Sequence, residues 1–277
     1  MNEAPELKEL RSFRRGRVDS RQEVRRALRM RSNYERFLYS NVRKLLREHV
    51  QEAAMSYQET GRFNPRLFSR ALYQDLSPLF VSFLRRMIIN TYKYYEEQYE
   101  GGRKAQHDEV FVFGKLIDIE KLVNDYFRGR ELVLSGIPTT IANRINKLLI
   151  DAREENLTYA ATAKKIRDTI IPLSTARAAM IARTEVHNAA SFASHNYHNT
   201  IRNDLGINMF KQWVAVNDAR TRSTHSEANG QRVHMDEKFN VGGAEMDYAG
   251  DPAGGAKNVI NCRCVIIYAD EEDDVLP

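Results

Sequence analysis

Cysteine is scarce in this sequence, which holds only Cys262 and Cys264 among its 277 residues. Small secreted proteins that are held together by disulfides need several spaced cysteines. Two cysteines separated by a single residue would also form a strained bridge. We therefore expect two reduced thiols and exclude a disulfide-scaffolded secreted protein.

Long apolar runs are absent as well, because no stretch approaches the ~18 consecutive apolar residues of a membrane-spanning helix. The first five residues lack the basic-then-apolar plan of a secretory signal. These two absences predict a soluble protein of the cytoplasm that has no membrane partner.

Enzyme motifs are the third absence. The sequence contains no Gly-x4-Gly-Lys-Ser/Thr phosphate loop, no Gly-x-Ser-x-Gly and no His-Glu-x2-His. Asp218, His225, His234 and Asp236 are residue types that hold catalytic metals, but their order and spacing match no hydrolase signature. The sequence therefore favours a protein that is not an enzyme.

Positive charge is concentrated at the start of the chain. Residues 1–50 hold 14 Lys and Arg against 7 Asp and Glu, a local net charge of +7, whereas the remaining residues sum to −2 and include an acidic run at 270–274. A basic arm predicts contact with double-stranded DNA or with an acidic protein surface, and a solvated helix face is the alternative. The arginines of this candidate surface are Arg14, Arg15, Arg17, Arg21, Arg25, Arg26, Arg29 and Arg31.

Apolar residues recur at helical spacing over most of the first 200 residues. Asn64-Pro65 and Ser77-Pro78 each join a capping side chain to a proline suited to the first helical position, so each predicts a helix start. The helices that we expect end at Gly61 or cover about 65–75, 78–99, 119–127, about 139 onward, 158–168 and 174–200.

Four tyrosines, Tyr92, Tyr94, Tyr95 and Tyr99, follow a strongly apolar stripe. Nucleobases can stack on such rings. Packing between helices or subunits is the commoner use of a tyrosine tract, and it is the interpretation that we favour.

The helix expected from about 174 to 200 has two unusual faces. Small residues on one face permit close packing, and they are Ala178, Ala182, Ala189 and Ala193. A polar face carries residues four apart, namely Arg183, His187, Ser191 and His195. Histidines at this spacing can bind a metal or face acidic residues, but we favour a solvated surface.

The pattern changes after Gly206, where β-rich segments at about 209–216 and 264–268 alternate as strands do. A polar turn region at 218–230 and a glycine-rich irregular loop at 236–257 are expected between them. The fold class that follows is α+β, with a predominantly helical N-terminal body and a small α+β module that contains a long helix and a short antiparallel sheet.

Four side chains of metal-ligand type gather late in the chain, and they are His225, His234, Cys262 and Cys264. Two imidazoles and two thiolates suit zinc. The spacing is less suitable, because Cys-x-Cys lacks the tight turn of Cys-x2-Cys and His-x8-His is not zinc-finger spacing. Zinc is therefore one interpretation, and two small buried thiols are the other.

An ordered series of short motifs covers roughly residues 140–268. It comprises Ile181-Ala182-Arg183-Thr184-Glu185, Trp213, Asp218-Ala219-Arg220-Thr221-Arg222 with His225, Gly230, Asp251-Pro252 and Asn261-Cys262-Arg263-Cys264. Each piece is weak alone, but the order, the spacing and the closing Asn-Cys-Arg-Cys are specific. The series resembles the Mu F-like minor head protein (head morphogenesis) family of tailed bacteriophages.

The resemblance implies a low-copy minor capsid protein that acts in head morphogenesis and virion assembly. Its implied partners are the phage portal protein, a capsid or scaffold protein and double-stranded DNA, with which some members leave the head. Its implied place is inside the virion head, after assembly in the cytoplasm of the host bacterium. An ADP-ribosyltransferase-like enzyme and a metal-dependent nuclease are the alternatives, although no convincing Glu-x-Glu loop supports the former.

One branch of that family carries Cys-x2-Cys after its Asp-x-Arg-Thr turn and a His before Asn-Cys-Arg-Cys. Here Arg222 and His225 take the place of the pair, and Val259 takes the place of the histidine. The resemblance therefore implies an incomplete zinc set of His225, Cys262 and Cys264, with His234 as a candidate fourth ligand.

The motif residues can also be explained without metal, and this is the interpretation that we favour. Asp218 is suited to accept backbone N–H bonds in a turn. Arg220, Arg222 and Arg263 are suited to form forks with Asp218, Glu185 or Glu227, and Gly230 after Asn229 suits a tight hairpin turn.

The chain is therefore expected to divide into three parts. Residues 1–135 are a helical region that faces the portal or DNA, with the basic arm at 1–50. Residues 136–268 are the Mu F-like module, and residues 269–277 are an acidic tail.

Overall fold

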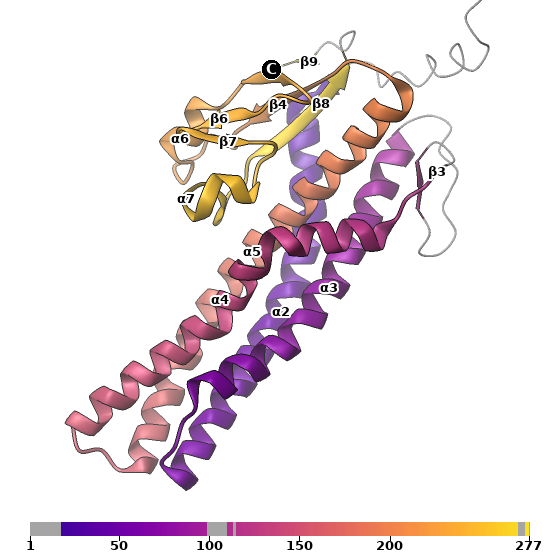
Figure 1. Ribbon diagram of the computed structural model, residues 1–277. Coiled ribbons are helices and arrows are strands. Elements are labelled where there is room, and N and C mark those ends of the chain that lie inside the picture. The colour runs from indigo at the N-terminus through magenta and orange to yellow at the C-terminus, as the bar shows by residue number, and fades with distance from the viewer. Residues whose placement is uncertain (1–17, 99–109, 113–114, 271–274, 277) are drawn as a thin grey trace, which may run out of the picture. The chain divides into compact units, whose positions relative to one another are not determined.

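The computed structural model describes residues 18–98, 110–112, 115–270 and 275–276 (Figure 1). It confirms the α+β fold class, with a predominantly helical chain and small sheets. The chain forms two compact units that are discontinuous in sequence. Unit 1 comprises residues 1–33, 84–126 and 184–277, and unit 2 comprises residues 34–83 and 127–183.

Four long helices dominate the described residues. They are α2 (Ser20–Thr60), α3 (Pro65–Gln98), α4 (Ile119–Glu154) and α5 (Tyr159–Leu205). Three short ones are α6 (Ser223–Glu227), η2 (Pro252–Gly254) and α7 (Gly255–Val259). Each long helix contributes one segment to each unit, so the single cut expected near residue 135 differs from the interleaved division that the structure shows.

Prolines do not end helices where the sequence suggested that they would. Pro78 lies inside α3, Pro138 inside α4 and Pro172 inside α5, so each pair of helices expected around these residues is a single helix. The separate helices at 65–75 and 78–99, and those at 158–168 and 174–200, were therefore wrong. An internal proline costs about 3 kcal/mol, which a long buried face on both sides of it can offset. Ser174, expected as a cap, is buried within α5 instead.

The caps expected at true helix starts are confirmed. The Asn64 side chain accepts the backbone N–H groups of Arg66 and Leu67 at 3.0 and 3.1 Å, with Pro65 at the first helical position. Thr158 Oγ1 accepts the Ala161 N–H at 3.2 Å at the start of α5. Gly61 follows α2 with φ +64°, a left-handed conformation that favours glycine.

Unit 2 is built from helical segments alone among the described residues. Ring contact between Tyr34 and Phe83, together with a 2.7 Å contact between His49 Nε2 and Asp75, shows that its α2 and α3 segments run antiparallel. Its interior is mainly apolar, with Leu46 and Leu72 fully buried and Phe80 nearly so, although Arg130 and Ser174 are buried there too. Unit 2 is therefore a helical bundle stabilised mainly by burial of aliphatic and aromatic side chains.

Unit 1 places the C-terminal segment of α5 at its centre. Tyr126 of α4 contacts Phe192 at a ring distance of 5.2 Å, and Tyr95 of α3 stacks on Tyr197 at 5.1 Å. On a further side, His198 stacks on Tyr268 of the sheet at 4.1 Å. Packing on several faces buries Tyr92 and partly buries Tyr94 and Tyr95, and Tyr99 lies outside the described residues.

The main sheet of unit 1 has three antiparallel strands in the order β5–β4–β8. They are β4 (Met209–Val214), β5 (Arg232–His234) and β8 (Val265–Asp270), and Trp213 pairs with Ile266 across β4 and β8. Two strands were expected here, at 209–216 and 264–268, and both are confirmed. The other pairs are β1 (Val18–Asp19) with β9 (Val275–Leu276), in parallel, and β2 (Phe111–Val112) with β3 (Lys115–Leu116).

Residues 236–257 were expected as an irregular loop, and this was wrong. The segment forms the hairpin of β6 (Phe239–Val241) and β7 (Ala244–Met246), followed by η2 and α7 (Figure 1). Gly242 and Gly243, with φ of +58° and +80°, make the hairpin turn. The glycines that suggested irregularity are therefore turn residues between short regular elements.

No helix among the described residues is long and apolar enough to cross a membrane.

Candidate metal centre and its supporting contacts

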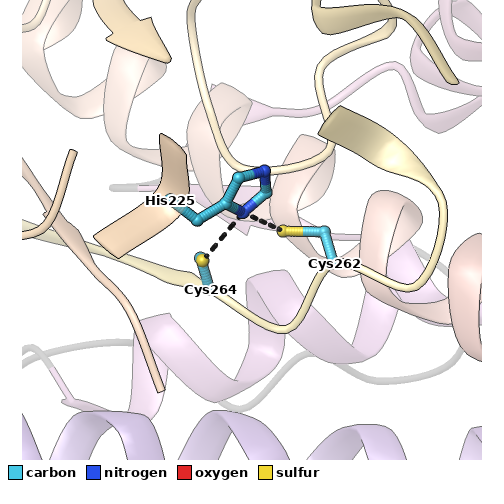
Figure 2. A group of neighbouring side chains, drawn as sticks. All are labelled: His225, Cys262 and Cys264. Carbon is cyan, nitrogen blue, oxygen red and sulfur yellow. Dashed lines mark hydrogen bonds between the residues drawn. The ribbon is translucent and has the colours of Figure 1, made fainter. Parts of the chain in front are cut away.

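His225, Cys262 and Cys264 converge in unit 1, with their potential ligand atoms all within 4.8 Å of one another. His225 Nδ1 lies 3.3 Å from Cys264 Sγ and 3.7 Å from Cys262 Sγ (Figure 2). The exposed fractions of these residues are 1%, 1% and 3%. One imidazole nitrogen thus faces two sulfurs in a space closed to solvent.

The backbone before the cysteines explains why both sulfurs point to the same side. Asn261 adopts a left-handed conformation with φ +57°, and its N–H donates to Thr184 Oγ1 on α5 at 3.1 Å. The chain then alternates, so the Cys262 and Cys264 side chains are buried while the side chain of Arg263 is more exposed. Thr184, a residue of the Arg-Thr-Glu motif, therefore fixes the turn from which the two thiols extend.

The two thiols differ in acidity. A hydrogen bond from Cys264 lowers the pKa of Cys262 well below its usual value, and His187 and His225 act in the same direction. The same pairing raises the pKa of Cys264, and burial raises it further. These opposite shifts favour a thiolate at Cys262 and a protonated thiol at Cys264. Neither cysteine forms a disulfide, as expected.

His187 is a fourth member of this region that the sequence did not predict there. Its Nδ1 lies 2.7 Å from Arg31 NH1, and its ring interacts with the Cys262 sulfur. Burial lowers the pKa of His187, so the ring is neutral, and its Nε2 makes no hydrogen bond of ordinary geometry. The solvated face expected for this part of α5 was wrong, because His187 and Ser191 are buried and both contact Arg31.

His234, the fourth ligand suggested by the sequence, lies elsewhere. It is exposed on β5, where its ring lies 4.2 Å from that of Phe210. The structure therefore brings together three of the four suggested ligands. The missed residue, His187, is 38 positions before His225 in sequence, and its helical spacing to Ser191 and His195 was the only signal that it belonged to a polar cluster.

Asp218 and Arg263 form one of the carboxylate forks that the motif residues suggested, and we call this ion pair the Asp218–Arg263 brace. Arg263 NH1 donates to Asp218 Oδ2 at 2.7 Å, and NH2 donates to Oδ1. Asp218 also accepts the Arg220 backbone N–H at 3.0 Å, as expected of a turn residue. The Arg263 guanidinium, which donates both hydrogen bonds, holds the pKa of Asp218 far below its usual range. The pair ties the turn after β4 to the segment between the two cysteines.

Of the other expected contacts, the Arg220–Asp218 pair forms through one nitrogen only, and Arg222 contacts a backbone carbonyl. Arg220 is exposed and reaches Asp218 at 3.4 Å, whereas Arg222 NH2 donates to the Ile260 carbonyl at 2.5 Å. Gly230 has the positive φ of a turn, +84°, but closes the loop between α6 and β5, so a two-residue hairpin at Asn229-Gly230 was wrong. Thr221 Oγ1 accepts the Asp218 N–H at 3.1 Å.

Trp213 and Glu185 lie in the interior. Trp213 is fully buried, and its ring meets His225 edge to face at 5.7 Å. Glu185 has an exposed fraction of 4%, and Tyr126 Oη donates to it at 3.2 Å. Arg183, on α5, is partly exposed. Among the described residues of this motif series, the carboxylates of Glu185 and Asp218 therefore contact other side chains of the protein, Tyr126 and Arg263.

Residues 143–267 match the family model described as Phage Mu protein F like protein. This segment is therefore similar to that family, and we call residues 143–267 the Mu F-like domain. The match includes every residue of the His225–Cys262–Cys264 cluster, together with Thr184, Asp218 and Arg263. The family resemblance inferred from the motif series is thereby confirmed.

Two curated relatives of different name are similar to the chain. Minor head protein GP7 of Bacillus phage SPP1 is 34% identical over 113 residues, which are 40% of this chain and 35% of that protein. NAD(+)–arginine ADP-ribosyltransferase EFV of Enterococcus faecalis (strain ATCC 700802 / V583) is 33% identical over 153 residues, 54% of this chain and 30% of that protein. The chain therefore spans about a third of each relative. No solved structure matches it significantly.

A second set of buried polar contacts supports the Mu F-like domain. Lys211 is fully buried on β4, where Nζ donates to the Asp247 carbonyl at 3.0 Å and lies 3.7 Å from the carboxylate of the same residue. Asp251 accepts the N–H groups of Asp247 and Ala253 at 2.7 and 2.9 Å. Gly250 has φ +94°, and a Cβ there would lie 2.3 Å from Asn188 Oδ1. These contacts explain why Asp251 of the motif series follows a glycine, since the backbone before it lies against Asn188 and its carboxylate holds two backbone N–H groups.

The basic arm is described only in part. Arg14, Arg15 and Arg17 lie outside the described residues, as does the side chain of Arg21. On α2, Arg25 and Arg29 are exposed and Arg26 is partly exposed. Arg31 is buried and contacts His187, so it is placed as an internal brace and not on a surface.

Proposed function

We propose that this chain is a minor head protein of a tailed bacteriophage, located inside the virion head and associated with the portal protein. It would assemble in the cytoplasm of the host bacterium. The Mu F-like domain and the similarity to a minor head protein of Bacillus phage SPP1 support this proposal. Capsid or scaffold proteins are further proposed partners, and departure with the genome is a proposed fate.

The observation that carries the proposal is the inward orientation of the motif side chains. Thr184 holds the Asn261 turn, Glu185 accepts from Tyr126, and Asp218 pairs with Arg263. Each of these groups is engaged by another part of unit 1. Reactive groups of an enzyme must reach a substrate, whereas groups with these partners stabilise a module. The arrangement therefore favours a structural component.

Portal association can be tested by co-expression with the portal protein encoded in the same phage genome, followed by size-exclusion chromatography. We expect the two proteins to elute together, and purified heads to contain the chain at a few copies by quantitative mass spectrometry. Deletion of the gene should yield heads that lack this protein and infect poorly. Purified heads of the unmodified phage that contain no copy of the chain would contradict the proposal.

DNA contact is proposed for the basic arm, with exposed Arg25 and Arg29 as its described members. Binding that depends on phosphate neutralisation weakens steeply with salt, with a slope of ~0.9 per phosphate in a plot of log affinity against log salt concentration. Fluorescence anisotropy with duplex DNA across a salt series measures this slope. The variant R25Q/R29Q should reduce the slope by about two.

A matched control removes the same charge elsewhere. Arg66 and Arg70 are exposed on α3 in unit 2, so R66Q/R70Q lowers the net charge equally without touching the arm. An equal reduction of the salt slope in both double variants would indicate a general effect of net charge. Absence of DNA binding by the unmodified chain at low salt would remove DNA from the proposed partners.

The second candidate function is ADP-ribosyl transfer, because one relative is named as an NAD(+)–arginine ADP-ribosyltransferase. The similarity covers only 30% of that protein. In this chain Thr184 and Glu185 are buried, and both are engaged by internal hydrogen bonds. Incubation of the chain with NAD and an arginine-rich acceptor protein tests the candidate. Nicotinamide release that is lost in E185Q would replace the structural proposal with an enzymatic one.

The metal-dependent nuclease considered from the sequence has less support. Asp218 is paired with Arg263, His225 is buried against two sulfurs, and His234 is exposed on a separate strand. Duplex DNA incubated with the chain and Mg²⁺ or Mn²⁺ should therefore stay intact on a gel. Cleavage that is lost in D218N would support the nuclease.

A further inference from the structure

We propose that His225 Nδ1, Cys262 Sγ and Cys264 Sγ bind one thiophilic divalent ion such as Zn²⁺, and that His187, supported by Arg31, positions the Cys262 sulfur. This proposal goes beyond a role in the phage head and does not depend on it. It assigns a ligand set that differs from the one suggested by the sequence, because His234 is excluded and His187 enters as a positioning residue.

The two nitrogen–sulfur distances fit a tetrahedral ion, and all three ligand atoms lie within 4.8 Å of one another. Zinc bonds of ~2.0–2.1 Å to nitrogen and ~2.3 Å to sulfur, at a tetrahedral angle, separate N and S by about 3.6 Å. The observed separations from His225 Nδ1 are 3.3 Å to Cys264 and 3.7 Å to Cys262. A small rotation of the side chains would place one ion at bonding distance from all three atoms.

Hydrogen bonding alone accounts poorly for this geometry. A neutral imidazole nitrogen carries either one proton or one lone pair, so His225 Nδ1 can form one full hydrogen bond. Two sulfurs nevertheless lie against that nitrogen in a buried space. A metal ion at this position would bond to all three groups. Two thiolates and a neutral imidazole would also cancel the charge of a divalent ion, which lowers the cost of burial.

The tautomer of His187 decides between a ligand and a positioning role. The Arg31 guanidinium can only donate hydrogen bonds, so Nδ1 of His187, 2.7 Å away, must accept. The proton of the neutral ring then sits on Nε2, which therefore cannot bind a metal. Within the part of the chain that the structure describes, this buried Nε2 makes no hydrogen bond of ordinary geometry, and the His187 ring interacts with the Cys262 sulfur. The Nε2–H is placed to donate to the sulfur, as outer partners of metal-bound groups do.

Metal content of the full chain gives the first test. The chain is purified under reducing conditions, stripped with a chelator and titrated with Co²⁺ in place of Zn²⁺. We expect one ion per chain, with thiolate-to-cobalt charge-transfer bands, and displacement by Zn²⁺. Absence of stoichiometric binding by the unmodified, reduced chain would overturn the proposal.

Variants test the ligand set. C262S, C264S and H225N should each abolish stoichiometric binding, whereas H234N, which changes the exposed histidine, should bind as the unmodified chain does. Circular dichroism checks that each variant is helical. If the ligand variants fail to fold, the unmodified chain still tests whether zinc binds, because zinc should raise its thermal midpoint of unfolding and a chelator should lower it. Undiminished binding by folded C262S or C264S would contradict the assignment.

The positioning role of His187 has its own readout. H187Q keeps an N–H donor near the sulfur, so we expect affinity to fall by at most ~10–100-fold, the range for outer partners of metal ligands. The cobalt spectrum of H187Q should stay unchanged, and X-ray absorption of the zinc form should show two sulfurs and one imidazole. Two imidazoles, or a changed cobalt spectrum in H187Q, would show that His187 is a ligand and refute this role.

Discussion

The two units of this chain are stabilised by different kinds of contact. In unit 2, fully buried aliphatic residues such as Leu46 and Leu72 recur along helices, and the helix starts are capped locally by Asn64 and Thr158. In unit 1, polar pairs join residues far apart in sequence. Arg31 contacts His187, and Asp218 pairs with Arg263.

This difference between the two units follows from their secondary structure. A helix satisfies its own backbone groups, so a helical bundle needs only an apolar face to pack. The module around the sheet in unit 1 is made of short strands and turns. It buries apolar side chains such as Trp213 and Phe239 as well, but the loops between its strands must be fixed by side-chain contacts. Polar braces in unit 1 therefore do the positioning that apolar burial does in unit 2, and substitutions should separate the two.

The largest effect is expected from an apolar truncation in unit 2. Leu72 on α3 is fully buried, so L72A should lower the free energy of unfolding by about 2–5 kcal/mol through lost burial and a residual cavity. Urea unfolding followed by circular dichroism measures the change. Leu67 on the same helix has an exposed fraction of 63%, so L67A should change stability by about 0.5 kcal/mol or less. Similar losses in both variants would contradict an apolar origin of the stability of unit 2.

A smaller loss of stability is expected when the pH is lowered, because of a buried histidine in unit 1. Burial lowers the pKa of His195 from 6.5 to about 4, with Lys211 adding to the shift and Asp247 opposing it. Between these pH values the unfolded chain binds a proton at His195 that the folded chain does not, so stability falls as the pH falls from 6.5 to 4. The full loss is about 3 kcal/mol, measurable as urea midpoints across this pH range.

The control for this pH dependence is H195Q, which removes the titrating group and keeps a polar side chain between Tyr248 and Tyr268. The dependence should flatten in H195Q but not vanish, because burial also lowers the pKa of His187. Parallel pH profiles for the two proteins would show that His195 does not contribute.

The smallest effect is expected at the Asp218–Arg263 brace. R263K keeps the charge but loses the two-pronged geometry of the fork, so we expect a slight fall in thermal midpoint and severalfold faster amide hydrogen exchange at residues 217–221. R220K is the matched control, because Arg220 is exposed and lies 3.4 Å from the same carboxylate. Exchange that accelerates equally in both variants would show that the fork does not hold the turn.

Local signals in the sequence gave the helix starts at Asn64 and Thr158 correctly, whereas the starts expected at Ser77-Pro78 and Ser174 lie inside single long helices. Asn64 and Thr158 cap helices as expected, since a cap depends on its own side chain and the next few backbone groups. Pro78, Pro138 and the capping residue Ser174 suggested breaks that do not occur. The loss of one hydrogen bond is visible in the sequence, but the packing that offsets it is not.

The candidate metal centre was predicted in part for a similar reason. Residue type and the motif series singled out His225, Cys262 and Cys264, which do converge. His234 was preferred to His187 because it lies nearer to the cysteines in sequence. A histidine on a strand edge and a histidine on a central helix look alike in sequence, so only the position of α5 reveals which one faces the sulfurs.

By itself, the sequence determined the α+β class, the amphipathic helices, the capped helix starts at Asn64 and Thr158, strands at about 209–216 and 264–268 and the Mu F-like motif series. These depend on local propensity, periodicity and residue order. Only the tertiary structure decided that His187 and Arg31 are buried together and that Arg263, not Arg222, forks with Asp218. Such contacts join distant segments, and their geometry exists only once the intervening helices and strands have packed.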